Sequence, residues 1–260
     1  MPGPEVVVLP SAGALAADVA ARVGATLAHA QQQRTRAALA LTAGSIMEQI
    51  WAELAEPAAA EAVDWSRVDV FWGDERFVPS DSPDRNDGPA ETLLFGKAPF
   101  SAARRFSMPA SDGEYGNDLD AAAAGYARTL YEARRPDDQD EVPNFDVVLL
   151  GVGPDGHCCS LFPEHPSLYD DSAAVIPVRN SPKPPPLRLS LSFDGLNTAN
   201  EIWVVASGSR KADAAVMGLG GAGRVQVPVS GARGRFRTLW LLDNDAAAKL
   251  PRSIYRLPVS

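Results

Sequence analysis

Residues 145–163 read FDVVLLGVGPDGHCCSLFP, and this stretch carries the strongest indication of the fold. Residues 145–150 form a short, mostly apolar run that is typical of a strand buried on both faces. The turn that follows holds three glycines and a proline and leads to His157. Open α/β sheets bind ligands at the carboxyl ends of their strands, so His157 is a candidate proton-transfer group. A histidine that merely caps a helix is the alternative.

The rest of the chain repeats this alternation of short apolar segments and helical segments. Ser11 is the expected N-cap of the first helix. Residues 187–193 alternate apolar with polar side chains, which predicts a half-buried strand. The whole pattern predicts an α/β fold with a mainly parallel sheet and a single domain over residues 1–260. The predicted strands are 6–9, 36–41, 68–72, 145–150, 174–178, 187–193, 202–206 and 238–242, and the helices are 12–33, 46–54, 119–134 and 209–217.

Composition limits the partners. The net charge of −9 argues against nucleic acid or an anionic membrane, although a small phosphorylated molecule needs only a local cluster of cations. No apolar run approaches the roughly 20 residues of a membrane span. The two cysteines are adjacent, so no disulfide framework is expected and a cytoplasmic location is predicted. With three histidines they make no zinc pattern, and we expect neither a metal nor a cofactor.

Two strand ends carry residues suited to an anion. Residues 42–45 read TAGS between a strand and a helix, where small side chains expose backbone N–H groups at a helix N-terminus. A purely structural turn is the alternative there. Residues 72–79 read WGDERFVP, in which Arg76 offers a planar fork to a phosphate. An ion-pair cluster that stabilises the turn is the alternative for this block.

Two further segments supply positive charge. Lys183 lies in the proline-rich segment 181–185, just before the alternating strand with Arg188, and a solvated loop lysine is the alternative reading. Lys211 stands at the start of a helix, against the preference of the helix dipole. A cation at that position makes more sense if an anion binds between it and the backbone N–H groups.

These blocks resemble the motifs of the 6-phosphogluconolactonases, a family in one superfamily with the glucosamine-6-phosphate deaminases. The strongest match is residues 151–157 followed by Ser-Leu-Phe-Pro, and five blocks occur in the family's order between residues 41 and 212. The resemblance implies a three-layer, Rossmann-like sandwich. The chain departs from the family at Ala43, which replaces a glycine, and at Ile46-Met47, which replace Thr-Pro. Backbone donors and Ser45 remain, so we expect the anion site to persist.

The resemblance implies hydrolysis of 6-phospho-D-glucono-1,5-lactone, a small-molecule substrate, without a metal. His157 would be the general base, and either Asp155 or Glu75 would orient its ring. Asp74 would lie near the reacting end of the sugar, because the matching acid of the deaminases serves as a base. The residues expected to contact the substrate, chiefly at its phosphate or oxyanion, are Thr42, Ala43, Gly44, Ser45, Arg76, Asn86, Lys183, Arg188 and Lys211.

Two other functions stay open. The first is a sugar-phosphate isomerase or deaminase of the same superfamily, and the second is a non-catalytic sugar-phosphate sensor. The arginine that follows Asp74 and Glu75 argues against the deaminase, and an intact His157 argues against the sensor. Cys158 and Cys159 are expected to be small side chains packed beneath the loop. We expect a monomer or a weak homo-oligomer.

Overall fold

The computed structural model describes residues 3–56, 61, 63–97, 99–170 and 173–256. Its main sheet has the strand order β11-β1-β10-β9-β6-β2-β3-β5, and every neighbouring pair in it is parallel. The predicted parallel sheet is therefore confirmed. The strands are β1 (Glu5–Leu9), β2 (Ala37–Leu41), β3 (Val68–Trp72), β5 (Arg104–Phe106), β6 (Val147–Gly151), β9 (Glu201–Ala206), β10 (Arg237–Asp243) and β11 (Tyr255–Arg256).

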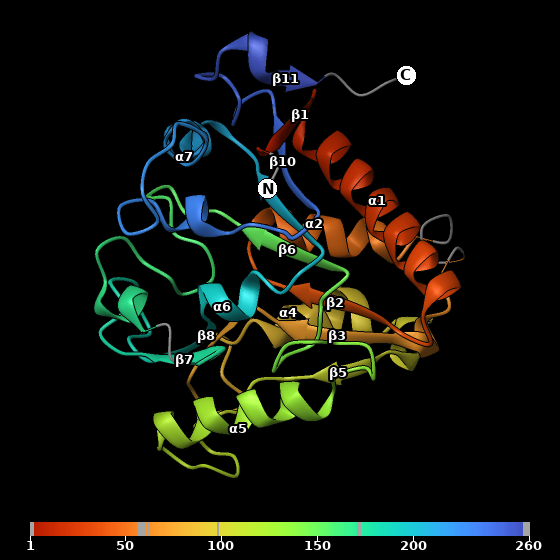
Figure 1. The fold of residues 1–260 in the computed structure, drawn as a ribbon, viewed down its shortest axis with the longest axis vertical. Coiled ribbons are helices and arrows are strands. Elements are labelled where there is room, and N and C mark those ends of the chain that lie inside the picture. The colour runs from red at the N-terminus through yellow and green to blue at the C-terminus, as the bar shows by residue number, and fades with distance from the viewer. Residues whose placement is uncertain (1–2, 57–60, 62, 98, 171–172, 257–260) are drawn as a thin grey trace.

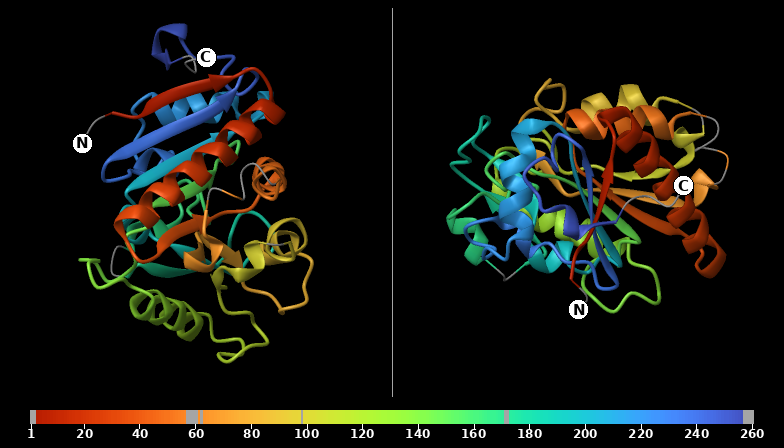
Figure 2. Two further views of the ribbon diagram at one scale, coloured as in Figure 1. Left: turned by 90° about the vertical axis from the view of Figure 1, so that its right-hand side faces the viewer. Right: turned by 90° about the horizontal axis from the view of Figure 1, so that it is seen from above.

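Helices lie on both faces of this sheet, as Figures 1 and 2 show, with α1 and α2 on one face and α7 on the other. The first helix begins after Ser11, whose Oγ accepts the Ala14 N–H as predicted. That the chain forms one domain stays a prediction. The described helices are α1 (Ala12–Gln33), α2 (Ser45–Leu54), α4 (Asp87–Ala90), α5 (Leu119–Glu132), α6 (Phe193–Leu196) and α7 (Ala212–Leu219).

The strand order reverses between β2 and β6. From β2 the chain proceeds to β3 and β5 on one side, and from β6 it proceeds to β9 and β10 on the other. Such a switch point separates the connections of the two neighbouring strands and opens a crevice above their carboxyl ends. Thr42 bridges this point, because its Oγ1 donates to the Leu149 carbonyl and accepts the Gly151 N–H, both at 3.0 Å.

A second, antiparallel sheet was not predicted. It has the order β4-β8-β7 and lies beside the carboxyl end of β3. Its strand β4 follows β3 after one glycine and contains the acidic and basic residues of the 72–79 block. The sheet therefore brings this block alongside a distant part of the chain. Its strands are β4 (Asp74–Arg76), β7 (Val175–Val178) and β8 (Arg188–Leu191).

The prediction of a half-buried strand over residues 187–193 is wrong, because all four residues of β8 are buried. The guanidinium of Arg188 donates to the carbonyls of Pro184 and Pro185, and Ser190 Oγ accepts the Ser160 N–H. The loop just before β8 and the loop that carries Ser160 thus cover the polar face of this strand. The alternation of side chains indicated a strand correctly, but it could not show what covers its second face.

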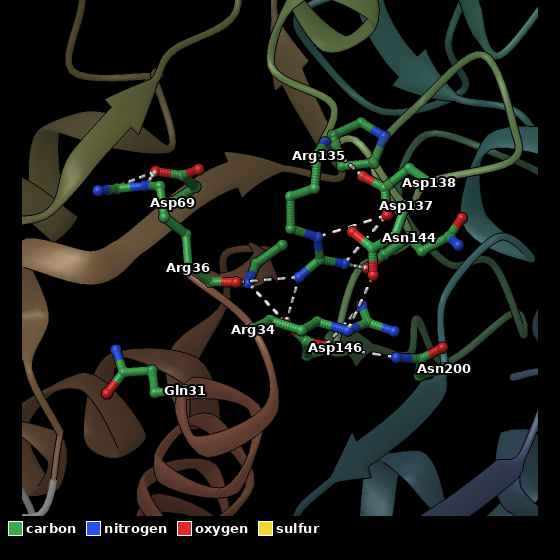
Figure 3. A network of polar contacts seen from close by, with 12 residues as sticks. Gln31, Arg34, Arg36, Asp69, Arg135, Asp137, Asp138, Asn144, Asp146 and Asn200 are labelled. Atoms are coloured by element: carbon green, nitrogen blue, oxygen red, sulfur yellow. Dashed lines mark hydrogen bonds and ion pairs between the residues drawn. The ribbon is translucent and has the colours of Figure 1, made fainter.

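A polar network lies at the amino ends of the central strands of the main sheet, on the side away from the crevice (Figure 3). Asp146 lies just before β6, and its Oδ2 accepts hydrogen bonds from the Ala38 N–H and from Arg135 Nη1, both at 2.8 Å. Its Oδ1 accepts one from Arg34 Nη1 at 3.4 Å. Asn200, just before β9, donates to the same carboxylate. This network joins the amino ends of β2, β6 and β9, whose carboxyl ends form the crevice. It therefore helps to fix the strands relative to one another without taking part in the pocket.

Candidate active site

One pocket lies at the switch point, above the carboxyl ends of β2, β6 and β9. It brings together eleven of the thirteen side chains or loop residues that the sequence singled out. The exceptions are Asp155, which lies immediately behind the pocket wall, and Glu75, which is buried beneath it. The eleven are Thr42, Ala43, Gly44, Ser45, Asp74, Arg76, Asn86, His157, Lys183, Arg188 and Lys211.

His157 and Asp155 form a close pair. His157 Nδ1 lies 2.5 Å from Asp155 Oδ1, and Lys183 Nζ lies 3.3 Å from the other carboxylate oxygen. Burial acts to raise the pKa of Asp155, but the hydrogen bond and charge of His157, together with Lys183, hold that pKa well below its usual range. Lys183 Nζ also lies 3.1 Å from Nδ1. Both Lys183 and the imidazole can donate to the ionised carboxylate, which only accepts hydrogen bonds, so we assign the proton to Nδ1. Nε2 is then free to accept a proton.

The glycine turn after β6 makes room for this pair. The Gly153 N–H donates to the His157 carbonyl at 2.8 Å and closes the turn. A Cβ atom on Gly153 would lie 1.9 Å from His157 Nδ1 and 2.4 Å from Asp155 Oδ1. Only glycine therefore lets the imidazole and the carboxylate meet over the backbone. The ring of Phe162 lies 4.8 Å from the imidazole, centroid to centroid, and supports it from the following loop.

Two arginines face each other at the pocket. Arg76 of β4 and Arg188 of β8 are directly opposite in the antiparallel ladder, so their side chains leave the same face. Among the described residues, neither arginine forms an ion pair with a carboxylate; both instead donate to backbone carbonyls. Burial lowers the pKa of Arg188, and Arg76 lowers it further, although Asp74 opposes both effects. Like charges opposite each other are unfavourable unless an anion lies between them.

Lys211 and the loop after β2 line the same pocket as the arginines. Lys211 Nζ donates to the Val152 carbonyl at 2.7 Å, and burial lowers its pKa, followed by the charges of Lys183 and Arg210. Gly44 has φ of +142°, which favours glycine, and no side chain caps the helix α2 that begins after it. The first N–H groups of α2 are thus left for another acceptor.

Asp74 and Asn86 complete the wall beside Arg76. Asp74 Oδ2 accepts the hydroxyl of the buried Ser160 at 2.7 Å, and Asn86 Nδ2 donates to the Asp74 carbonyl at 2.8 Å. Glu75 has different surroundings, because its carboxylate accepts backbone N–H groups under the pocket floor. Burial raises the pKa of Glu75 to about 7, although the Asn86 N–H and Arg85 act against this. Of the two carboxylates considered for orienting His157, it is Asp155 that contacts the ring.

The sequence interpretation missed two residues that shape the pocket. Ser207, which follows β9, lines the pocket, and its hydroxyl donates to Asp243 Oδ2 at 2.6 Å. Asp243 is buried and also accepts the Gly208 N–H, so it fixes the turn that leads to Lys211. The rule that ligands bind at strand ends would have found Ser207, because it directly follows a predicted strand. Asp243 ends β10, and only the fold places it beside β9.

Both cysteines are free and buried, and Cys159 also lines the pocket. Burial raises the pKa of Cys158 to about 12 and that of Cys159 well above its ordinary value, with Asp74 adding to both. These thiols are therefore poor nucleophiles.

We expect the double variant Cys158→Thr/Cys159→Ala to keep the wild-type kcat and KM within about twofold, because neither thiol ionises and neither residue holds the His157 ring. Steady-state kinetics before and after treatment with iodoacetamide check this. A change in kcat or KM beyond this range would contradict the expectation. Inactivation of the wild type by the reagent, absent in the double variant, would show a reactive thiol and contradict its stated reason.

Within the described ranges, no group of three or more His, Cys, Asp or Glu side chains could hold a metal ion. Among the helices that the structure describes, none is both long and apolar enough to span a membrane.

The fold and the pocket place this chain among the α/β proteins that carry a ligand pocket at the switch point of a parallel sheet. The profile of the family described as glucosamine-6-phosphate isomerases/6-phosphogluconolactonase matches residues 10–240, and the chain belongs to this family. The chain is 48% identical to a 6-phosphogluconolactonase of Streptomyces coelicolor over 97% of both chains. It is 42% identical to one of Mycobacterium tuberculosis, over 94% of this chain and 97% of that relative.

Solved structures agree with the predicted fold class. A 6-phosphogluconolactonase from Trypanosoma brucei has a TM-score of 0.80 and 27% identity, covering 95% of this chain and 99% of that one. A monomeric glucosamine-6-phosphate deaminase has a TM-score of 0.76 at 20% identity, covering 94% and 99%. Since both kinds of enzyme share the fold, the activity has to be argued from the site.

Proposed function

We propose that this chain is an enzyme that hydrolyses 6-phospho-D-glucono-1,5-lactone to 6-phosphogluconate. The observation that carries the proposal is the joining of a paired base with a cluster of cations in one pocket. His157 lines that pocket and is paired with Asp155 behind it, and Arg76, Arg188 and Lys211 line the pocket as well. The relatives at 48% and 42% identity, both 6-phosphogluconolactonases, support the same activity.

The chemistry needs a base for water and donors for an oxyanion. His157 Nε2 takes a proton from water, and the resulting hydroxide attacks the lactone carbonyl carbon. The tetrahedral oxyanion then collapses and expels the ring oxygen, which receives the proton back from His157. Asp155 holds the ring in the required tautomer and stabilises the imidazolium that forms. We propose that Lys183 and Arg188, which line the pocket, stabilise the oxyanion or a phosphate oxygen.

Phosphate recognition explains why an acidic protein concentrates cations here. We propose that Arg76, Lys211 and the backbone of residues 42–45 bind the 6-phosphate. Asn86 helps to hold the strand that carries Arg76, because its side chain donates to the Asp74 carbonyl. The hydroxyl of Thr42 is engaged with β6, so this residue contributes through its backbone. We propose that Asp74 accepts a sugar hydroxyl, because Ser160 occupies only one of its carboxylate oxygens.

A deaminase of the same family is the second candidate, since one such enzyme shares the fold. The two opposed arginines fit hydrolysis of a phosphorylated lactone, in which one cation can bind the phosphate and the other can stabilise the oxyanion. We further propose a single-domain cytoplasmic enzyme that acts as a monomer or weak homo-oligomer. Its two buried, free thiols suit a reducing compartment.

The test is a pH-stat measurement of acid release from freshly prepared 6-phosphogluconolactone, corrected for spontaneous hydrolysis. We expect release well above background, unchanged by EDTA, and no ammonia release from glucosamine 6-phosphate. Ammonia release without lactone hydrolysis would assign the deaminase activity instead. Binding of 6-phosphogluconate without either reaction would indicate the sensor.

A further inference from the structure

Glu75 is a buried carboxylate that joins two segments of the pocket wall. Its side chain is 1% exposed. Oε1 accepts the N–H groups of Arg76 and Asn86, each at 2.7 Å, and Oε2 accepts the N–H of Asp87 at 3.2 Å. Arg85 hydrogen-bonds the Asp87 carboxylate at 2.8 Å and also lies 3.7 Å from Glu75 Oε2. One carboxylate thus binds strand β4 and the nearby turn 84–87 at the same time.

Two further hydrogen bonds run between the same segments. Asn86 Nδ2 donates to the Asp74 carbonyl at 2.8 Å, and Arg76 Nη1 donates to the Asp84 carbonyl at 2.5 Å. Arg76 and Asn86 both line the pocket, and each reaches across to the segment that carries the other. The segments that carry these two side chains are thus joined both by their own hydrogen bonds and by the carboxylate of Glu75, which accepts the backbone N–H groups of both residues.

The surroundings of Glu75 are not arranged for stability alone. Arg76 Nε, Arg85 Nη1 and Asn86 Oδ1 are buried, and none has a hydrogen-bond partner among the described residues. Arg76 also stands opposite Arg188 in the β4-β8 ladder. Unpaired buried polar atoms and opposed like charges both oppose folding, so their concentration around one carboxylate indicates a functional constraint.

We propose that Glu75 is a positioning residue that sets the affinity for the phosphorylated end of the substrate by holding Arg76 and Asn86 in register. This inference rests on the proposed function for the identity of the ligand. It differs from the expectation that Glu75 orients His157, because Asp155 holds that ring. Loss of the Glu75 carboxylate should therefore weaken binding and leave the chemical step intact.

The test compares Glu75→Gln with the wild type. The amide keeps one oxygen for the N–H groups of Arg76 and Asn86 but turns an NH2 group toward the N–H of Asp87 and toward Arg85. We expect the Kd for 6-phosphogluconate, measured by calorimetry, to rise about tenfold, because the amide leaves the buried N–H of Asp87 and the Arg85 guanidinium poorly paired. We expect kcat for the phosphorylated lactone, and kcat/KM for unphosphorylated gluconolactone, to change less than about twofold.

Asp146→Asn is the matched control, since Asp146 is also a buried carboxylate that accepts a backbone N–H and an arginine, at the opposite edge of the sheet. It should lower Tm without changing Kd. An unchanged Kd in folded Glu75→Gln would overturn the proposal, and so would an equal loss of kcat on both lactones. Glu75→Asp, which keeps the charge but is one methylene shorter, should also raise Kd and serves if Glu75→Gln does not fold.

Failure of both variants to fold would show that Glu75 is required for folding, and this would contradict the proposal. The binding measurement also separates this inference from the activity. If the wild type did not hydrolyse the lactone, the proposed function would be wrong, yet a changed Kd for inorganic phosphate in Glu75→Gln would still support Glu75 as the anchor of an anion site.

Discussion

The His157→Asn variant is expected to hydrolyse 6-phosphogluconolactone about 10² to 10⁴ times more slowly than the wild type, the usual contribution of a positioned general base. Asparagine approximates the shape of the Nδ1 side of the ring and can still meet Asp155, but it offers no basic nitrogen at Nε2. Binding of 6-phosphogluconate should stay within about threefold, because the cations of the pocket are untouched. Steady-state kinetics and calorimetry on the purified variant measure both quantities.

His165→Asn is the matched control for this variant. His165 contacts Ser167 and the Arg179 carbonyl and does not line the pocket. It should leave kcat and KM near the wild-type values. Turnover close to wild type in folded His157→Asn would remove His157 from the mechanism, whatever the control shows.

The second large effect is expected from Arg76→Ala and Lys211→Ala. Removing one partner of a buried, charge-assisted contact costs about 2 to 5 kcal/mol, so kcat/KM for the phosphorylated lactone should fall by roughly 30-fold or more. The loss of kcat/KM for unphosphorylated gluconolactone should be much smaller, because that substrate has no phosphate for these cations to bind. The ratio of kcat/KM for the two substrates is therefore the quantity to measure in each variant.

Arg210→Ala controls for the general loss of positive charge, since Arg210 is exposed and adjacent to Lys211 but does not line the pocket. It should leave the substrate ratio unchanged. Should Arg76→Ala or Lys211→Ala lower both activities by one common factor, that residue would serve the chemistry or the fold, and its assignment to the phosphate would be wrong.

Much of the main sheet could be predicted from the sequence because its strands are buried on both faces and end in glycine-containing or small-residue turns. The first helix occupies Ala12–Gln33 as predicted, and the third strand occupies Val68–Trp72. The missed strands β4, β5 and β11 have only two or three residues. Segments this short show no periodicity, and they become strands only because a neighbour supplies the hydrogen bonds.

The site was predictable as a set of strand ends but not as a set of contacts. Residues that follow parallel strands meet at one edge, which brings His157 and the 42–45 loop together. The choice between Asp155 and Glu75 as the partner of His157 could not be made, because it depends on the antiparallel pairing of β4 with β8. That pairing is non-local, with Asp74 opposite Ser190, and it directs the Glu75 side chain under the pocket floor.

We propose that one pocket holds the phosphate at its cations and the reacting carbon at His157. A crystal structure with 6-phosphogluconate bound would show both ends of the ligand at once. We predict phosphate oxygens in hydrogen-bond contact with Arg76 and Lys211, and a carboxylate oxygen of the product about 2.6 to 3.2 Å from His157 Nε2. A product bound outside this pocket, or one with its phosphate against His157 and its carboxylate at Arg76 and Lys211, would contradict the account.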